Sequence, residues 1–118
     1  MIQVDIEFIH KVLDSNIQIQ ELVDMNIEIA NLRYNYINNR KNIIIMAKVI
    51  FDIEYIPIDK MEIRNLEIKK LLNKFINLDK SVLHKNNYDK NFEIVNKKIK
   101  LIEENTIFAN ASIDLMIS

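Results

Sequence analysis

A histidine and two acids near the start of the chain have the residue types that bind metals or transfer protons. Glu7 precedes His10 by three residues, and Asp14 follows one helical turn later. In a helical bundle, a Glu-x-x-His step places two metal ligands on one face. A dinuclear site needs a second such step, but His84 has Ser81 at that spacing. The sequence therefore predicts a solvated surface here and no metal site.

Nucleophilic and cofactor chemistry have fewer candidates still. The chain contains no cysteine and no glycine, which excludes thiol nucleophiles, glycine-rich phosphate loops and the nucleophile elbow. No grouping of serine, histidine and acid suggests a triad. Glu103 and Glu104 are neighbours whose side chains point apart on a helix. We expect no enzyme, with no catalytic residue, no cofactor and no small-molecule substrate.

One segment mixes basic and aromatic residues, as proteins that bind single-stranded nucleic acids do. Its members are Arg33, Tyr34, Tyr36, Arg40 and Lys41. Acids are interleaved along the whole chain, and the formal net charge is −1. No bulk electrostatic field therefore attracts the protein to nucleic acid, and we do not favour nucleic acid as the partner.

Composition bounds the class of protein. At 118 residues the chain is expected to form one domain, residues 1–118. Zero glycine and one proline favour long helices, because tight β-turns with positive φ usually need glycine. The absence of cysteine fits an intracellular protein or a bacterial protein exported without a disulfide step. The excess of isoleucine and asparagine is typical of an AT-rich genome.

The last segment has the most regular apolar pattern. Apolar and small residues recur at spacings of three and four over about four heptads: Phe92, Val95, Ile99, Ile102, Thr106, Ala109, Ile113 and Met116. This heptad seam predicts a long C-terminal helix of the coiled-coil type, beginning near Asp89. A second row repeats every seven residues beside it and forms the candidate interaction surface: Ile94, Leu101, Phe108 and Leu115.

The remaining elements complete an all-α prediction, an antiparallel helical hairpin or small helical bundle. Helical stripes are expected over 5–36 and 59–83, separated by an asparagine-rich break at 35–42. The stretch 43–58 fits a helix face, which we favour, but its alternation also fits a short strand around 43–56. The first eight residues alternate too, and a strand at 43–56 could pair with them. Pro57 ends either element.

No segment predicts membrane insertion or a cleaved signal. No run reaches the roughly 18–20 apolar residues of a membrane span. The N-terminus, MIQVDIEF, has two acids and no basic region before its apolar residues. We expect a cytoplasmic protein, or one exported without a cleaved signal peptide.

Two segments carry a family resemblance. A leucine-rich stretch, EIKKLLNKFINLDKSVL, is followed by a polar loop and by NFEIVNKKIKLIEENTIFANASIDLM. This half of the chain resembles small proteins of the WXG superfamily, especially the accessory helical-hairpin proteins of LXG-domain toxins in type VII secretion of Gram-positive bacteria. Glu104, Phe108, Ala109 and Ile113 occupy places comparable to that family's final-helix pattern. The chain has no Trp-x-Gly turn.

The resemblance implies a toxin-targeting or export adaptor that works in a hetero-oligomer. It also points to an export-like motif, Tyr55-x-x-x-Asp59, although this match lies mid-chain and the family's signal follows the final helix. We therefore expect a non-enzymatic adaptor that binds another helical protein. The alternative is a small phage or mobile-element regulator that binds protein or nucleic acid.

Overall fold

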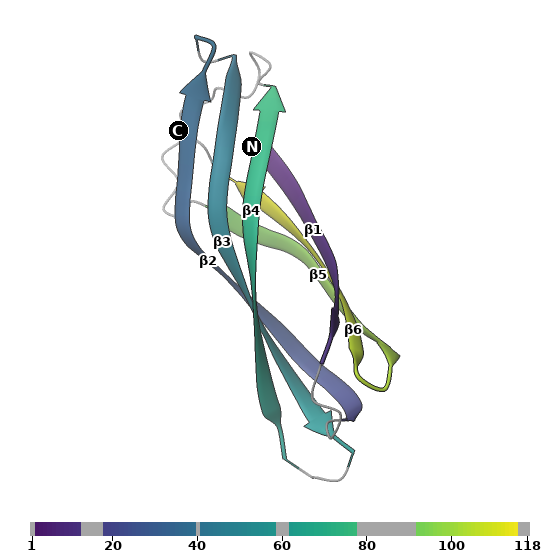
Figure 1. Ribbon diagram of the computed structural model, residues 1–118. Coiled ribbons are helices and arrows are strands. Elements are labelled where there is room, and N and C mark those ends of the chain that lie inside the picture. The colour runs from purple at the N-terminus through teal and green to yellow at the C-terminus, as the bar shows by residue number, and fades with distance from the viewer. Residues whose placement is uncertain (1, 13–17, 40, 59–61, 78–91, 116–118) are drawn as a thin grey trace.

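The chain folds into two antiparallel three-stranded sheets that pack face to face (Figure 1). The computed structural model describes residues 2–12, 18–39, 41–58, 62–77 and 92–115. These ranges form β1 (Ile2–Lys11), β2 (Ile19–Ile37), β3 (Asn42–Pro57), β4 (Arg64–Asn77), β5 (Phe92–Glu103) and β6 (Thr106–Leu115). The strand orders are β1-β6-β5 and β2-β3-β4, in a body that measures 56 × 24 × 20 Å.

The all-α prediction is wrong, and so are the helical hairpin and the coiled coil. The described ranges contain no helix, and hence none that could cross a membrane. The predicted C-terminal helix is instead a β5–β6 hairpin that turns at Glu104 and Asn105. A register shift between Ile94 and Asn96 moves the inward positions of β5 from even to odd numbers. Apolar residues around such a bulge fall at mixed spacings that imitate a helical stripe.

The absence of glycine did not exclude tight β-turns, because asparagine adopts the positive φ angles that glycine usually supplies. Asn31, Asn38 and Asn39 have φ values of 55°, 52° and 57°. Asparagine tolerates this left-handed region better than most residues with a Cβ. Asn38 and Asn39 form the β2–β3 turn, where the Lys41 amide donates to the Asn38 carbonyl at 3.2 Å. The predicted break at 35–42 is thus confirmed as a turn, but between strands.

The strand alternative for 43–56 is confirmed. It is β3, which ends at Pro57 as expected and whose odd-numbered residues, from Ile43 onward, are all buried. The suggested pairing with the N-terminus is wrong, because β3 lies between β2 and β4 while β1 pairs with β6. The helices expected over 5–36 and 59–83 are strands wherever the structure describes them, and Asp59 lies outside the described residues.

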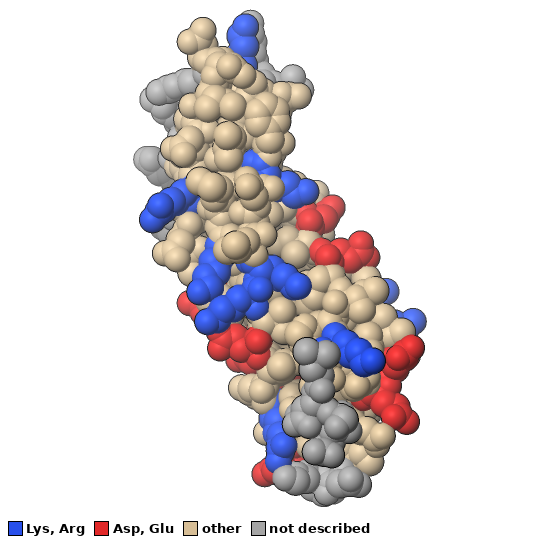
Figure 2. Space-filling view, viewed as in Figure 1, with Lys and Arg blue, Asp and Glu red and all other residues tan. Residues whose placement is uncertain are grey.

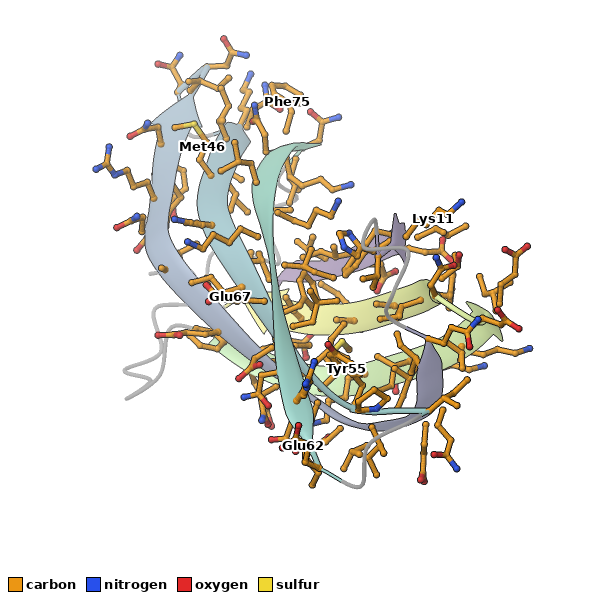
Figure 3. The ribbon with its side chains drawn as sticks, turned by 60° about the horizontal axis from the view of Figure 1, so that its bottom comes forward. Lys11, Met46, Tyr55, Glu62, Glu67 and Phe75 are labelled. Atoms are coloured by element: carbon orange, nitrogen blue, oxygen red, sulfur yellow. The ribbon has the colours of Figure 1, made fainter. Side chains whose placement is uncertain are left out.

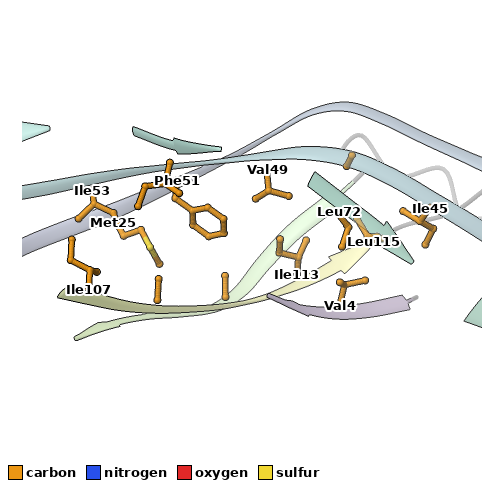
Figure 4. Close-up of a cluster of buried hydrophobic side chains, with 14 of the residues drawn as sticks. Val4, Met25, Ile45, Val49, Phe51, Ile53, Leu72, Ile107, Ile113 and Leu115 are labelled. Atoms are coloured by element: carbon orange, nitrogen blue, oxygen red, sulfur yellow. The ribbon is translucent and has the colours of Figure 1, made fainter. Parts of the chain in front are cut away.

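The core lies between the central strands of the two sheets, β3 and β6 (Figure 4). Val49, Phe51 and Ile53 of β3 are fully buried, as are Ile107 and Ile113 of β6. The Phe51 ring meets the Phe8 ring of β1 edge to face, with centroids 4.8 Å apart. Side chains alternate between inward and outward positions along both strands, and the packing of the inward ones against each other holds the sheets together.

Truncating this aromatic contact should be costly. Phe51→Ala removes a side chain with 0% exposure and should lower the free energy of unfolding by about 3–5 kcal/mol. Ile102→Ala is the control. The heptad seam would make Ile102 a core residue, whereas it is 49% exposed in the structure, so its truncation should cost about 0.5 kcal/mol or less. Urea denaturation of both variants measures this, and equal costs would contradict the sheet packing.

Candidate protein-binding face

Strand β3 is apolar on both of its faces over its first residues. Ile43 and Ile45 point into the core, while Ile44 and Met46 point to the opposite face of the sheet. The ladder with β4 sets Phe75 directly opposite Ile44 and Leu71 opposite Lys48. Phe75 is 58% exposed and Leu71 86%. Figure 3 shows Met46 and Phe75 at the same end of the sheet.

Basic residues lie on the same face of this sheet. Arg33 of β2 is opposite Met46, and Lys69 of β4 is opposite Ile50. We call this surface the apolar–basic face, and it comprises Arg33, Ile44, Met46, Lys48, Lys69, Leu71 and Phe75. Figure 2 shows a largely uncharged surface over this half of the sheet, with lysine and arginine side chains gathered along its lower border.

Charge changes sign further along the same outer face. Asp52 of β3 lies opposite Glu67 of β4, and Glu28 of β2 lies opposite Ile50. Lys69 Nζ lies 3.6 Å from Glu67 Oε1, and both side chains are more than half exposed. Such an exposed pair contributes little to stability. It marks the boundary between the apolar–basic face and an acidic end.

A hollow of about 400 Å³ lies within the apolar–basic face, lined by residues of all three strands. Its lining residues are Asn31, Arg33, Met46, Ala47, Lys48, Leu71, Leu72 and Asn73. Asn31 belongs to the irregular step of β2 between Ala30 and Arg33, and a bulge of this kind bends the strand and increases its twist. The hollow offers an apolar floor with two cations at its rim, which suits an apolar side chain beside an acid.

The predicted interaction row does not form one surface. Leu115 is buried, and the half-buried Ile94 and Leu101 pack against the same core. Phe108 lies on the outer face of β6, opposite Ile9 and Lys100. Phe108 and Leu115 are seven residues apart on β6, and an odd spacing along a regular strand places them on opposite faces. Ile94 and Leu101 have the same spacing on β5, but the register shift after Ile94 turns both toward the core.

The export-like motif is also not displayed. Tyr55 is 5% exposed within β3 and belongs to the core cluster, and Asp59 lies outside the described residues. Figure 3 shows Tyr55 on the half of the sheet away from Met46.

The other candidate groupings are separated by strand geometry. Glu7 faces outward opposite Asn110, whereas His10 is opposite the buried Ile107 on the inner face. Within the described ranges, no three of His, Asp or Glu come close enough to hold a metal ion.

The basic–aromatic segment is divided in the same way. Arg33 lies on the outer face, while Tyr34 and Tyr36 are opposite the buried Ile45 and Ile43. Lys41 is exposed in the β2–β3 turn, and Arg40 lies outside the described residues. Among the described members of this segment, Arg33 and Lys41 are the ones at exposed positions.

On the β2–β5 side of the molecule, Lys97 of β5 links the two sheets by contacts with β2. Lys97 Nζ donates to the Met25 carbonyl at 2.7 Å and lies 3.4 Å from Asp24 Oδ1. The Met25 amide donates to the same carboxylate at 2.8 Å, and this bond, followed by Lys97, holds the pKa of Asp24 below its usual value. A second hollow of about 500 Å³ lies beside this contact, between Ile27 and Val95.

No protein-family model, curated protein or solved structure matches the chain.

Sequence reasoning missed the apolar–basic face. The available signal was the run Ile43–Met46, which is apolar at odd and even positions alike. In a strand this means apolar residues on both faces, hence an outer face that is covered by another element or open to a partner. The helical interpretation placed Ile43 and Met46 on one buried stripe, whereas in the strand they lie on opposite faces.

The β1–β4 side contains one group suited to a pH test. Burial, and secondly the charge of Lys70, lower the pKa of His10 from its usual 6.5. The unfolded chain therefore binds more protons than the folded protein just below that value. Stability should be complete above about pH 6.5 and fall as the pH drops toward the folded-state pKa.

We expect His10→Gln to flatten this dependence. Urea midpoints measured between about pH 7 and pH 5 should decline less in the variant than in the wild type. His84→Gln removes the other histidine and serves as the matched control. If the decline of the urea midpoint persists in His10→Gln and disappears in His84→Gln, the prediction for His10 is contradicted.

Proposed function

We propose that this protein is a non-enzymatic protein-binding module and that the apolar–basic face is its binding surface. The observation that carries the proposal is the exposure of Met46, Leu71 and Phe75 side by side on one regular sheet face. Single exposed apolar residues are ordinary, but a contiguous group with a polar rim is typical of an interaction site. A sheet backed by a packed core holds such a group in a fixed arrangement.

The rim indicates the chemistry of the partner. Arg33, Lys48 and Lys69 lie along one border of the apolar centre. The nearest acids of the outer face are Glu28, which like Lys69 is opposite Ile50, and Glu67. A partner surface with apolar side chains and neighbouring carboxylates complements this arrangement. Complementary charge speeds association and selects the partner, while the buried apolar residues supply most of the affinity.

The expected adaptor role is retained here in a different structural form. Binding through paired helices is no longer available within the described ranges, so the partner would dock on a sheet. Whether that partner is a secreted toxin, and whether the chain is exported with it, stay predictions. The alternative role as a regulator that binds nucleic acid would draw on Arg33 and Lys41, both on exposed positions.

Site-specific photo-crosslinking can test the proposal. A photoreactive phenylalanine analogue at Phe75 should give one discrete protein adduct in cells that make this chain naturally. The same analogue at Ile63, which is 57% exposed beside β4, should not. The crosslinked protein is then purified, and its affinity for the free chain is measured directly.

Met46→Ser/Phe75→Ser should weaken that affinity at least about tenfold, because buried apolar anchors dominate binding energy. Arg33→Glu/Lys48→Glu should weaken it and reduce its salt dependence. Ile63→Ser should leave it unchanged. Equal affinity in all variants would contradict the proposal. Salt-sensitive binding to oligonucleotides that is lost in the Arg33 variant would favour the regulator instead.

A further inference from the structure

Two edge strands, β1 and β4, lie along the same side of the molecule. Among the described strands, each is paired on one side only, β1 with β6 and β4 with β3. Lys70 Nζ of β4 lies 5.0 Å from the centroid of the Phe8 ring of β1, so the two strands are neighbours across the sandwich although no ladder joins them. Their outer edges present backbone groups that a further strand could pair with.

The edges on the opposite side of the molecule are built differently. Strand β2 has three register shifts against β3, and β5 has two against β6. Lys97 also ties β5 to β2. Bulges and inward cations are the devices by which edge strands avoid pairing with other chains. Strands β1 and β4 also have an inward cation between them, Lys70 over Phe8, but they pair with their neighbours without any register shift. The difference between the two sides is therefore the regular backbone of the β1 and β4 edges.

The two regular edges carry opposite charge. From residue 68 to residue 77, β4 has three lysines, Lys69, Lys70 and Lys74, and no acid. From residue 3 to residue 9, β1 has two acids, Asp5 and Glu7, and no lysine or arginine. Both also expose an aliphatic side chain, since Leu71 of β4 is 86% exposed and Ile9 of β1 is 65% exposed.

The strand directions also match. The Val12 amide, just after β1, donates to the Asn105 carbonyl, and the Ile19 amide, which begins β2, donates to the Glu104 carbonyl. Strand β1 therefore runs toward the β5–β6 turn and β2 runs away from it. Strand β4 is parallel to β2, since both are antiparallel to β3, and so it is antiparallel to β1.

We propose that two copies of this chain form a dimer in which β4 of each copy pairs with β1 of the other. A two-fold axis parallel to the strands brings these edges together at two equivalent, antiparallel seams. Each β2-β3-β4 sheet then continues into the β1-β6-β5 sheet of the second copy. Lys69 lies on the outer face of its sheet, opposite Ile50, and then faces Asp5 and Glu7, which lie on the outer face of the second copy's sheet. Leu71 and Ile9 are covered. Lys69 and Leu71 belong both to this seam and to the apolar–basic face, so the dimer is tested by oligomeric state and the binding face by partner affinity.

Reciprocal charge reversal tests this arrangement. One variant reverses the outward lysine of β4, Lys69→Glu, and the other reverses the outward acids of β1, Asp5→Lys/Glu7→Lys. Light scattering coupled to size exclusion at low salt should show a wild-type dimer and two monomeric variants, each weakened at least about tenfold by like charge at both seams. A one-to-one mixture should dimerise again, because each of its two seams then joins opposite charges.

Lys98→Glu/Lys100→Glu is the matched control, because both lysines are exposed on β5, away from the proposed seams. It should remain dimeric. Circular dichroism of every variant must show the wild-type fold, which separates lost pairing from unfolding. A monomeric wild type, single variants that stay dimeric, or a mixture that stays monomeric would each overturn the proposal.

Discussion

The structure depends on the packing of β3 against β6. Each is the central strand of its sheet, and each buries every second residue, from Ile43 to Pro57 and from Ile107 to Leu115. Apolar side chains at period two can be removed from water only when a second sheet covers that face. The contact between Phe51 and Phe8 joins the sheets where β1 approaches β3. This shared core is the main interaction that holds the two long, narrow sheets together.

The surfaces available for function follow from this constraint. Because the core uses one face of each sheet, the opposite face of β2-β3-β4 is left outward, and its apolar residues, such as Met46 and Phe75, are exposed. Because the six described strands make two open sheets rather than one, these sheets have four edges. Bulges and Lys97 modify the edges of β2 and β5, and those of β1 and β4 have no register shift. The binding face and the proposed dimer seam follow from the same packing arrangement and meet on β4, at Lys69 and Leu71.

Part of this fold was readable from the sequence. The alternation in β3 and the turn at Asn38 and Asn39 were recognised, and Pro57 marks the end of its strand as expected. Burial alternates as regularly along β6. Its sequence shows this less clearly, because two inward residues are the small Ala109 and Ala111 and the aromatic Phe108 lies on the outward face. Local pattern alone does not distinguish a strand with a bulge from a helix.

The binding surface was harder to predict because it depends on pairing. Phe75 and Ile44 are 31 residues apart in sequence, and only the β3–β4 register places them directly opposite each other. The absence of glycine misled the choice of fold class, because three asparagines supply the positive φ angles at the β2 bulge and the β2–β3 turn. Backbone preferences of a residue type are shared with others, so its absence is weak evidence about fold.

One pair of neighbouring substitutions tests the packing of β3 most directly. Val49 is fully buried in the strand, whereas Ile50 faces outward opposite Lys69. A helix over the same residues would bury Ile50 and turn Val49 toward solvent. The free energy of unfolding should therefore fall by several kcal/mol in Val49→Asp, which buries a charge, and change little in Ile50→Asp. The opposite order of stabilities would contradict the two-sheet structure.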